Sequence, residues 1–283
     1  MTPVLQARGV SVAFGAVLAL DDVELEVGEG KLVGLIGPNG AGKTTFVDAI
    51  TGFVQASGTV HLEGRDISSL PPHRRARLGL ARTWQTIELF DDLSVRENLA
   101  VAARRPSLGS SCAEIVFGRQ PRAERLAEEA LALLDLEDVA EEMPSDLPQG
   151  RRKLVGVARA LVERPSLLLL DEPAAGLDTR ESEDFGQRLR RLVDGGLPML
   201  LIDHDMGLVL GICDEIYVLD FGRVIARGTP EEVRNDPRVL TAYLGTSATA
   251  EIERGTDVAV ASPGRRAPER DGARLTAPEA GDR

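Results

Sequence analysis

The sequence predicts an α/β fold that carries an N-terminal antiparallel β subdomain and an inserted α-helical subdomain. Short apolar runs alternate with helical patterns after residue 150, which is typical of a parallel sheet. Residues 23–27 alternate between apolar and acidic side chains with the period of two expected of a half-buried strand. Between residues 94 and 136, charged residues separate aliphatic ones at helical spacing.

The composition indicates a globular protein whose core is aliphatic. The chain has 283 residues, enough for one large domain or two modest ones, and only 4% of them are aromatic. Lys and Arg number 33 against 45 Asp and Glu, a net charge of −12. This charge has the wrong sign for a general phosphate-backbone binder, so we expect no nucleic acid partner.

The sequence shows no secretory signal at its start and no apolar run near the roughly 18 residues that span a bilayer. Any membrane role is therefore expected to be peripheral. The two cysteines, Cys112 and Cys213, are far apart and lack metal-ligand spacing. We interpret them as reduced packing residues.

The first elements in order are an antiparallel sheet, a buried strand and a helix. Residues 4–36 consist of short apolar runs separated by Gly and Asp turns, which predicts the sheet. Residues 32–36 are apolar on both faces and lead into a Gly-rich turn, followed by a predicted helix at residues 42–51.

After the helical subdomain, predicted at about residues 88–150, helices and strands alternate. We predict helices at residues 155–161 and 180–193, and buried strands at residues 167–170 and 199–202. No internal repeat is present, so one catalytic unit is expected in a domain of residues 1–245.

The C-terminal tail, residues 246–283, is rich in Ala, Pro, Gly, Arg and Glu and has few large apolar side chains. Such a segment buries too little surface to offset the entropy of ordering, so we predict disorder. A short docking helix near residues 250–260 is the alternative.

A phosphate-binding motif, G-x-x-x-x-G-K-[ST], follows the buried strand and opens the predicted helix. It comprises Gly37, Pro38, Asn39, Gly40, Ala41, Gly42, Lys43, Thr44 and Thr45. Its backbone N–H groups and the helix N-terminus favour phosphate oxygens. Lys43 is expected to reach the β and γ phosphates, and the Thr44 hydroxyl to bind magnesium. An ordinary Gly-rich turn is the alternative.

Two carboxylates, Asp171 and Glu172, follow the apolar run at residues 167–170. The carboxyl edge of the sheet would place them beside the phosphate loop. Asp171 suits magnesium, through a water molecule, and Glu172 can orient or deprotonate an attacking water. The alternative is an acidic helix cap.

These motifs resemble the ATP-binding subunit of ABC transporters, and the resemblance covers about residues 4–245. It implies a P-loop NTPase (RecA-like) core that binds ATP and Mg²⁺. Phe14 would stack on adenine, although a place in the small sheet's core is an alternative. Gln85 resembles the loop glutamine that ligates magnesium and senses the γ-phosphate, and His204 resembles the switch histidine.

Two further motifs resemble elements that act across an ABC dimer. Residues 174–178 match the loop that connects the two ATP sites, with Asp178 at its end; a helix-capping Asp is the alternative. Residues 147–151 occupy the place of the signature motif, usually close to LSGGQ. Gly150 keeps a backbone amide for the γ-phosphate, but Pro148 removes the usual hydroxyl and Arg151 replaces the usual glutamine.

Within that family the chain is most similar to the ATPase of branched-chain amino acid importers. The similarity rests on residues 37–45 followed by 51–53, on residues 77–85, 171–178 and 203–206, and on the ending at residues 228–245. It implies an ATPase coupled to transport at the cytoplasmic face of the membrane. It also implies a homodimer or a heterodimer with a paralogue, transmembrane permease subunits and, indirectly, an extracytoplasmic substrate-binding protein.

In the family, the region after Gln85, here residues 87–101, contacts the membrane subunit. Leu89 and Phe90 are therefore candidate contacts, and burial in the helical subdomain is the alternative. Three other functions remain open: an exporter ATPase of lipopolysaccharide type, a non-transport ABC ATPase, and an ATP-binding regulator without turnover. The single cassette, the absence of sustained heptads and the negative charge disfavour the non-transport ATPase.

Overall fold

The computed structural model describes residues 3–83, 89–103 and 121–243, all of which lie within one unit, Met1–Thr246. Gln85, Cys112 and the predicted tail at residues 246–283 lie outside the described residues.

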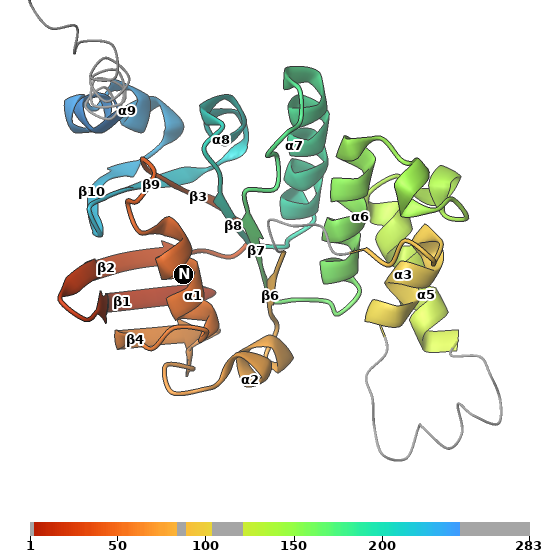
Figure 1. Ribbon diagram of the computed structural model, residues 1–283, viewed down its shortest axis with the longest axis horizontal. Helices are drawn as coiled ribbons and strands as arrows, with labels where there is room; N and C mark the ends of the chain where they lie inside the picture. Colours follow the sequence, from red (N-terminus) through yellow and green to blue (C-terminus); the bar gives the residue numbers. More distant parts are fainter. Residues whose placement is uncertain (1–2, 84–88, 104–120, 244–283) are drawn as a thin grey trace, which may run out of the picture. The chain divides into compact units, whose positions relative to one another are not determined.

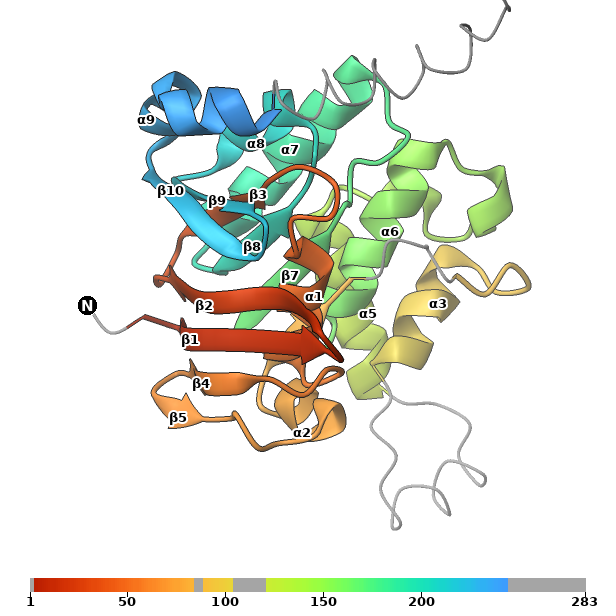
Figure 2. The same cartoon turned by 60° about the vertical axis from the view of Figure 1, so that its left-hand side comes forward.

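A four-stranded antiparallel sheet forms the N-terminal part, as predicted (Figure 2). Its strand order is β2-β1-β4-β5. The strands are β1 Leu5–Phe14, β2 Val17–Val27, β4 Ser57–Leu62 and β5 Arg65–Asp66. On β1, Leu5 and Ala7 are buried and so are Val10 and Val12, with a register shift between the two pairs. This agrees with one face against the core and one against solvent.

A six-stranded sheet forms the centre, in the order β10-β9-β3-β8-β7-β6 (Figure 1). All neighbours pair in parallel except β9 and β10, which are antiparallel. The strands are β3 Leu32–Ile36, β6 Leu80–Arg82, β7 Leu167–Asp171, β8 Met199–Ile202, β9 Glu215–Asp220 and β10 Arg223–Gly228. The predicted α/β class is confirmed.

Helices cover this sheet (Figure 1). The helices are α1 Lys43–Thr51, α2 Pro72–Arg77, α3 Val95–Ala102, α5 Pro121–Leu133, α6 Gln149–Leu161, α7 Thr179–Asp194, α8 Met206–Ile212 and α9 Pro230–Asn235. Of these, α3, α5 and α6 contact one another and form the helical part. Two 3₁₀ turns, η1 Glu137–Val139 and η2 Pro144–Asp146, join α5 to α6. The helical pattern predicted between residues 94 and 136 contains α3, which starts with a capping box of Ser94 and Glu97, and α5.

Two apolar cores lie on opposite faces of the central sheet because successive strand residues point to opposite sides. Leu168 and Leu170 of β7 belong to the core beneath α6 and α7. Leu167 and Leu169 belong to the core shared with α1 and the antiparallel sheet. The central strands are therefore fixed from both sides, and the loops at their carboxyl ends are held in defined positions.

Two further sequence predictions, on the cysteines and on membrane-spanning segments, can be compared with the structure. Cys213 is a free, buried thiol whose pKa is raised by burial, as expected of a packing residue. Among the described helices, none has the length and apolar character that crossing a membrane requires.

Candidate nucleotide-binding site

The predicted site residues gather at the carboxyl edge of the central sheet. The phosphate loop follows β3, Glu172 follows β7, and His204 follows β8. In this sheet β8 lies between β3 and β7, so the three loops start from adjacent strands. Loops at this edge of a parallel sheet are the usual place for ligands.

The phosphate loop has a backbone that only glycine adopts easily. Gly40 and Gly42 have φ values of 81° and 106°, in the left-handed region. A Cβ atom at Gly42 would lie 2.8 Å from the carbonyl oxygen of Ala19. The motif's glycines are therefore required by the turn and by its close packing against β2.

Lys43 is buried within this loop and points back into it. Its Nζ donates hydrogen bonds to the carbonyl oxygens of Gly37 at 2.7 Å and Pro38 at 3.0 Å. Burial lowers the pKa of Lys43, while the negative charges of Glu172 and Asp171 oppose that change. The loop thus holds a cation ready for phosphate oxygens in its concavity.

A cavity of about 420 Å³ opens beside the loop. It is lined by Val17, Leu18, Ala19, Asn39, Gly40, Ala41, Gly42, Lys43, Thr44, Thr45, Glu172, Phe221 and Gly222. The lining combines N–H groups at a helix start, one lysine, two threonine hydroxyls and one carboxylate. This donor set fits a triphosphate together with a hard divalent cation, and the predicted residues 39–45 and Glu172 all belong to it.

The two carboxylates at the end of β7 lie in different environments. Asp171 is buried and accepts a hydrogen bond from Arg82 at 2.8 Å. Glu172 has a φ of 46°, which is strained for a side chain with a Cβ, and its backbone N–H donates to Ile202 at 2.7 Å. Strain of this kind concentrates at functional positions, and here it turns the chain from β7 toward the cavity.

His204, which resembles the switch histidine of the family, lies close to Glu172. Its Nδ1 is 3.9 Å from Oε2 of Glu172 and 3.6 Å from Oδ1 of Asp203. The imidazole is 61% exposed, whereas the Asp203 side chain is fully buried. The histidine can therefore reach a ligand while its backbone is fixed.

Phe14 lies at the end of β1, in the hairpin whose second strand lines the cavity. Its side chain is 54% exposed, so it is not part of the small sheet's core, and it does not line the cavity. The hairpin instead contributes Val17, Leu18 and Ala19 to the lining. Gln85 lies outside the described residues.

The loop at residues 174–178 leads into α7, and Asp178 caps that helix. Its carboxylate accepts the N–H of Glu181 at 2.8 Å in a capping box. This is the alternative role that the sequence left open, and it is compatible with a second role in a dimer. Gly176 in the same loop has a φ of 80°, and a Cβ there would lie 2.7 Å from the Gln149 side chain.

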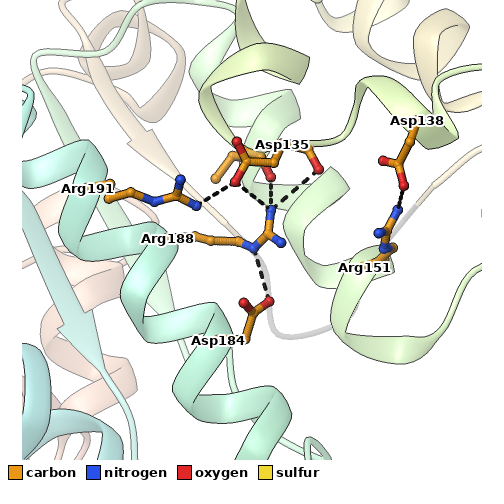
Figure 3. Close-up of polar contacts among 7 residues, drawn as sticks. Asp135, Asp138, Arg151, Asp184, Arg188 and Arg191 are labelled. Atoms are coloured by element: carbon orange, nitrogen blue, oxygen red, sulfur yellow. Dashed lines mark hydrogen bonds and ion pairs between the residues drawn. The ribbon is translucent and has the colours of Figure 1, made fainter.

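The signature segment forms the start of α6. Pro148 is the N-cap and provides no side-chain hydrogen bond, and Gly150 lies in the first turn. Arg151 donates from Nη1 to Oδ2 of Asp138 at 2.6 Å (Figure 3). That contact fixes the Arg151 side chain on η1.

The residues of the site that were not singled out from the sequence include Asp203, Arg82 and Phe221. Asp203 and Arg82 act through partners far away in the sequence, which no local pattern reveals. Phe221 lines the cavity from the turn between β9 and β10 with 88% of its surface exposed and a φ of 42°. An aromatic residue before a glycine in a turn was the available signal, but this pattern alone does not indicate a ligand site.

Comparisons with family models match this chain in two places. The model described as "ABC transporter" matches residues 20–175, which span the phosphate loop to the loop after β7. The model described as "Branched-chain amino acid ATP-binding cassette transporter" matches residues 223–249.

Similar proteins cover nearly the same region. The chain is 41% identical to the high-affinity branched-chain amino acid transport ATP-binding protein LivG of Salmonella typhimurium, over 86% of this chain and 98% of LivG. It is 40% identical to BraF of Pseudomonas aeruginosa, a protein described in the same words, with the same coverage.

Solved structures of ATP-binding cassettes from ABC transporters have the same fold. One, MJ1267, is 31% identical, with a TM-score of 0.77, over 86% of this chain and 99% of the other. In its ADP conformation the TM-score is 0.75 at 30% identity, over 87% of this chain and 100% of the other. A nucleotide-free cassette is 32% identical, with a TM-score of 0.74, over 86% and 99%.

Proposed function

The chain belongs to the ABC transporter family, whose general activity is ATP hydrolysis, and from this premise we propose that it is the ATP-hydrolysing subunit of a branched-chain amino acid importer. The observation that carries the proposal is the buried Lys43 in a glycine loop at the same sheet edge as Glu172 and His204. The similarity to LivG and BraF, and the match at residues 223–249, support branched-chain or related amino acids as cargo.

In the proposed reaction each residue of the site has a distinct task. The loop N–H groups and Lys43 bind the phosphates, and the apolar wall of Val17 and Leu18 accommodates the rest of the nucleotide. Glu172 orients the attacking water and accepts its proton. His204, 3.9 Å from Glu172, hydrogen-bonds the γ-phosphate and that water.

Magnesium fits the oxygen donors at this edge of the sheet. Thr44 lines the cavity and Asp171 lies at the end of β7, and hydroxyl and carboxylate oxygens are ligands that Mg²⁺ accepts. Thr44 and Asp171 would hold the ion, with Gln85 as a further ligand by resemblance. The ion would neutralise charge on the β and γ phosphates.

We further propose that two cassettes form a dimer, either of two copies or with a paralogue. Support comes from the start of α6 and the loop at residues 174–178, which approach each other at Gly176 and Gln149. Gly150 and Asp178 therefore lie on neighbouring segments. A second cassette could contact both at once, with Gly150 facing the other subunit's ATP.

Transmembrane permease subunits are the proposed partners, at the cytoplasmic face of the membrane. A second cavity, of about 680 Å³, supports this because residues of several helices and strands line it together and so offer a partner one shared surface. It is lined by Thr51, Phe53, Pro72, His73, Arg75, Ala76, Leu80, Ala81, Arg82, Ala102, Arg159, Ala160 and Glu163. Phe90 is 45% exposed nearby, with the Arg159 guanidinium 5.5 Å from its ring, whereas Leu89 packs against the core.

The proposal is tested by purifying the chain from its native cell membranes together with its bound subunits. We expect permease subunits to copurify, and the complex to hydrolyse ATP with magnesium and faster in the presence of a branched-chain amino acid and its binding protein. Glu172→Gln should retain ATP binding and lose turnover by about 100-fold or more. Copurification without amino acid stimulation would contradict the cargo, and turnover in Glu172→Gln near that of the parent would contradict the role of Glu172.

A further inference from the structure

The guanidinium of Arg82 lies between two carboxylates that come from different parts of the site. Its Nη1 binds Oδ1 of Asp48 at 2.5 Å, and its Nη2 binds Oδ2 of Asp171 at 2.8 Å. Arg82 is the last residue of β6, Asp171 is the last residue of the neighbouring β7, and Asp48 lies on α1 (Figure 1). One side chain thus joins the carboxylate at the end of β7 to α1, the helix that begins at the phosphate loop.

Burial gives these contacts their weight. The Arg82 and Asp171 side chains are 7% and 9% exposed, and Asp48 is 27% exposed. Charges removed from water in this way are stable only when they are paired and hydrogen-bonded. A guanidinium is planar and carries donors on separate nitrogens, so it can hold two carboxylates at a fixed separation, whereas an ammonium group carries all its donors on one freely rotating nitrogen.

The sheet alone does not make this connection. The strand before the phosphate loop, β3, pairs with β8 and β9, whereas β7 pairs with β8 and β6. No backbone hydrogen bond of these ladders joins β3 to β7, and the orientation of the Asp171 carboxylate relative to α1 depends on side chains. Arg82 supplies such a link, through Asp48.

We propose that Arg82 is a positioning residue that orients the Asp171 carboxylate toward the metal of the bound nucleotide. The inference rests on the proposed function, in which Thr44 and Asp171 hold magnesium. Arg82 occupies Oδ2 of Asp171, and a carboxylate has a second oxygen that remains able to accept a metal-bound water. Groups that hydrogen-bond a metal ligand in this way fix its direction and strengthen binding of the ion.

The test is Arg82→Met, which keeps the apolar stem and removes the donors. We expect the Mg²⁺ concentration for half-maximal ATP turnover, in the purified transporter complex, to rise about tenfold. Binding of a non-hydrolysable ATP analogue supplies a readout without turnover. The affinity gained on adding Mg²⁺ should fall by a similar factor, while the affinity without metal should stay within about twofold.

Arg75→Met is the matched control. Arg75 is also a buried arginine next to α1, but its guanidinium donates to the backbone carbonyl oxygens of Ala49, Ile50, Leu70 and Ser68. Its loss should lower the melting temperature without changing the Mg²⁺ requirement. An equal rise in both variants would show general destabilisation and would overturn the proposal.

Arg82→Lys keeps the test decisive if the methionine variant does not fold. Lysine restores the charge but has one nitrogen, so we expect a Mg²⁺ requirement at least about threefold above that of the parent. A Mg²⁺ requirement of Arg82→Met within about twofold of the parent would refute the role; where only Arg82→Lys folds, the same result in that variant would refute it. A Mg²⁺ requirement lower than that of the parent would also refute it, because Arg82 would then oppose metal binding. If the parent itself shows no metal-dependent binding or turnover, the proposed function fails instead.

Discussion

The carboxylate of Asp203 accepts a hydrogen bond from the backbone N–H of Ala174 at 3.1 Å, although 29 residues separate the two in the sequence. Its other oxygen accepts the N–H groups of His204 at 2.7 Å and Asp205 at 3.0 Å. Asp203 is fully buried. One carboxylate therefore fixes both the loop that bears His204 and the start of the loop that leads to Asp178.

We predict that Asp203→Asn lowers the free energy of unfolding by about 2–3 kcal/mol, because an amide NH₂ cannot accept these donors and hydrogen bonds to charged groups contribute about 1.5–3 kcal/mol. Burial lowers the pKa of Lys153, and the charge of Asp203 is the larger of two opposing effects. The substitution therefore also leaves a buried ammonium poorly compensated. Denaturant unfolding of the purified chain measures the loss.

The double variant Asp203→Asn with Lys153→Met separates these contributions. We expect it to recover at least about 1 kcal/mol relative to the sum of the single losses, since it removes the uncompensated charge. Strict additivity would mean that Lys153 and Asp203 do not interact.

Lys43→Ala should weaken MgATP binding by about 10- to 100-fold, the range expected for a charge-assisted hydrogen bond. In the structure the Lys43 ammonium is bound only by carbonyl oxygens of its own loop among the contacts described, so it can exchange them for phosphate oxygens. Calorimetric titration with MgATP measures the change. Lys31→Ala is the control: its side chain is 56% exposed and pairs with Asp214, and its loss should leave affinity unchanged. Equal affinity of Lys43→Ala and the parent would refute the phosphate-loop assignment.

The sequence predicts best those parts of the site that are contiguous in the chain. The residues from Gly37 to Thr45 act together because one turn supplies the N–H groups, the lysine and the threonine. The buried strands before Gly37 and Asp171 were also predictable, since apolar side chains on both faces leave little alternative to a central strand.

What the sequence does not reveal depends on pairs that only the fold brings together. Arg82 meets Asp48 and Asp171 across 34 and 89 residues, and none of the three has a local pattern that names its partner. The predicted helix at residues 155–161 begins six residues late for a different reason. The first five residues of α6 include no large apolar side chain, and Arg151, Arg152 and Lys153 are basic, so the apolar periodicity does not extend to the start of the helix.

The ion pairs between α7 and the residues that follow α5 predict a pH dependence of stability. Arg191 donates to Asp135 at 2.6 Å, and Arg188 donates to Asp135 at 3.3 Å and also to the Leu134 carbonyl oxygen (Figure 3). The hydrogen bond from Arg191 and the charges of both arginines lower the pKa of Asp135.

A carboxyl whose pKa is lower in the folded state stabilises the fold above its unfolded pKa, about 3.9, and loses that effect as the pH falls through the folded value. The free energy of unfolding of the parent should therefore exceed that of Asp135→Asn by a constant amount at neutral pH, within the roughly 0.2–1 kcal/mol of exposed pairs. The difference should shrink below about pH 4 and in high salt. Glu183→Gln, an exposed α7 change, should show no such trend. A difference that persists at low pH would show that the pairs do not act through charge.

The altered signature predicts unequal ATP sites if the chain pairs with a paralogue. Pro148 and Arg151 would face the γ-phosphate held by the other subunit's phosphate loop. Arg151 stands where the family usually has glutamine, and its side chain is paired with Asp138. The ATP site at this chain's Lys43 would then include the partner's signature motif, and the ATP site at the partner's phosphate loop would include the altered signature of this chain. We expect hydrolysis to be concentrated at the site that contains this chain's Glu172.

Glu172→Gln in this chain should then reduce the turnover of the heterodimer more than the equivalent change in a partner with a fuller signature. Membrane-reconstituted complexes in which each glutamate is replaced separately measure the two losses. Equal losses would contradict the asymmetry, because two equivalent sites would share the hydrolysis.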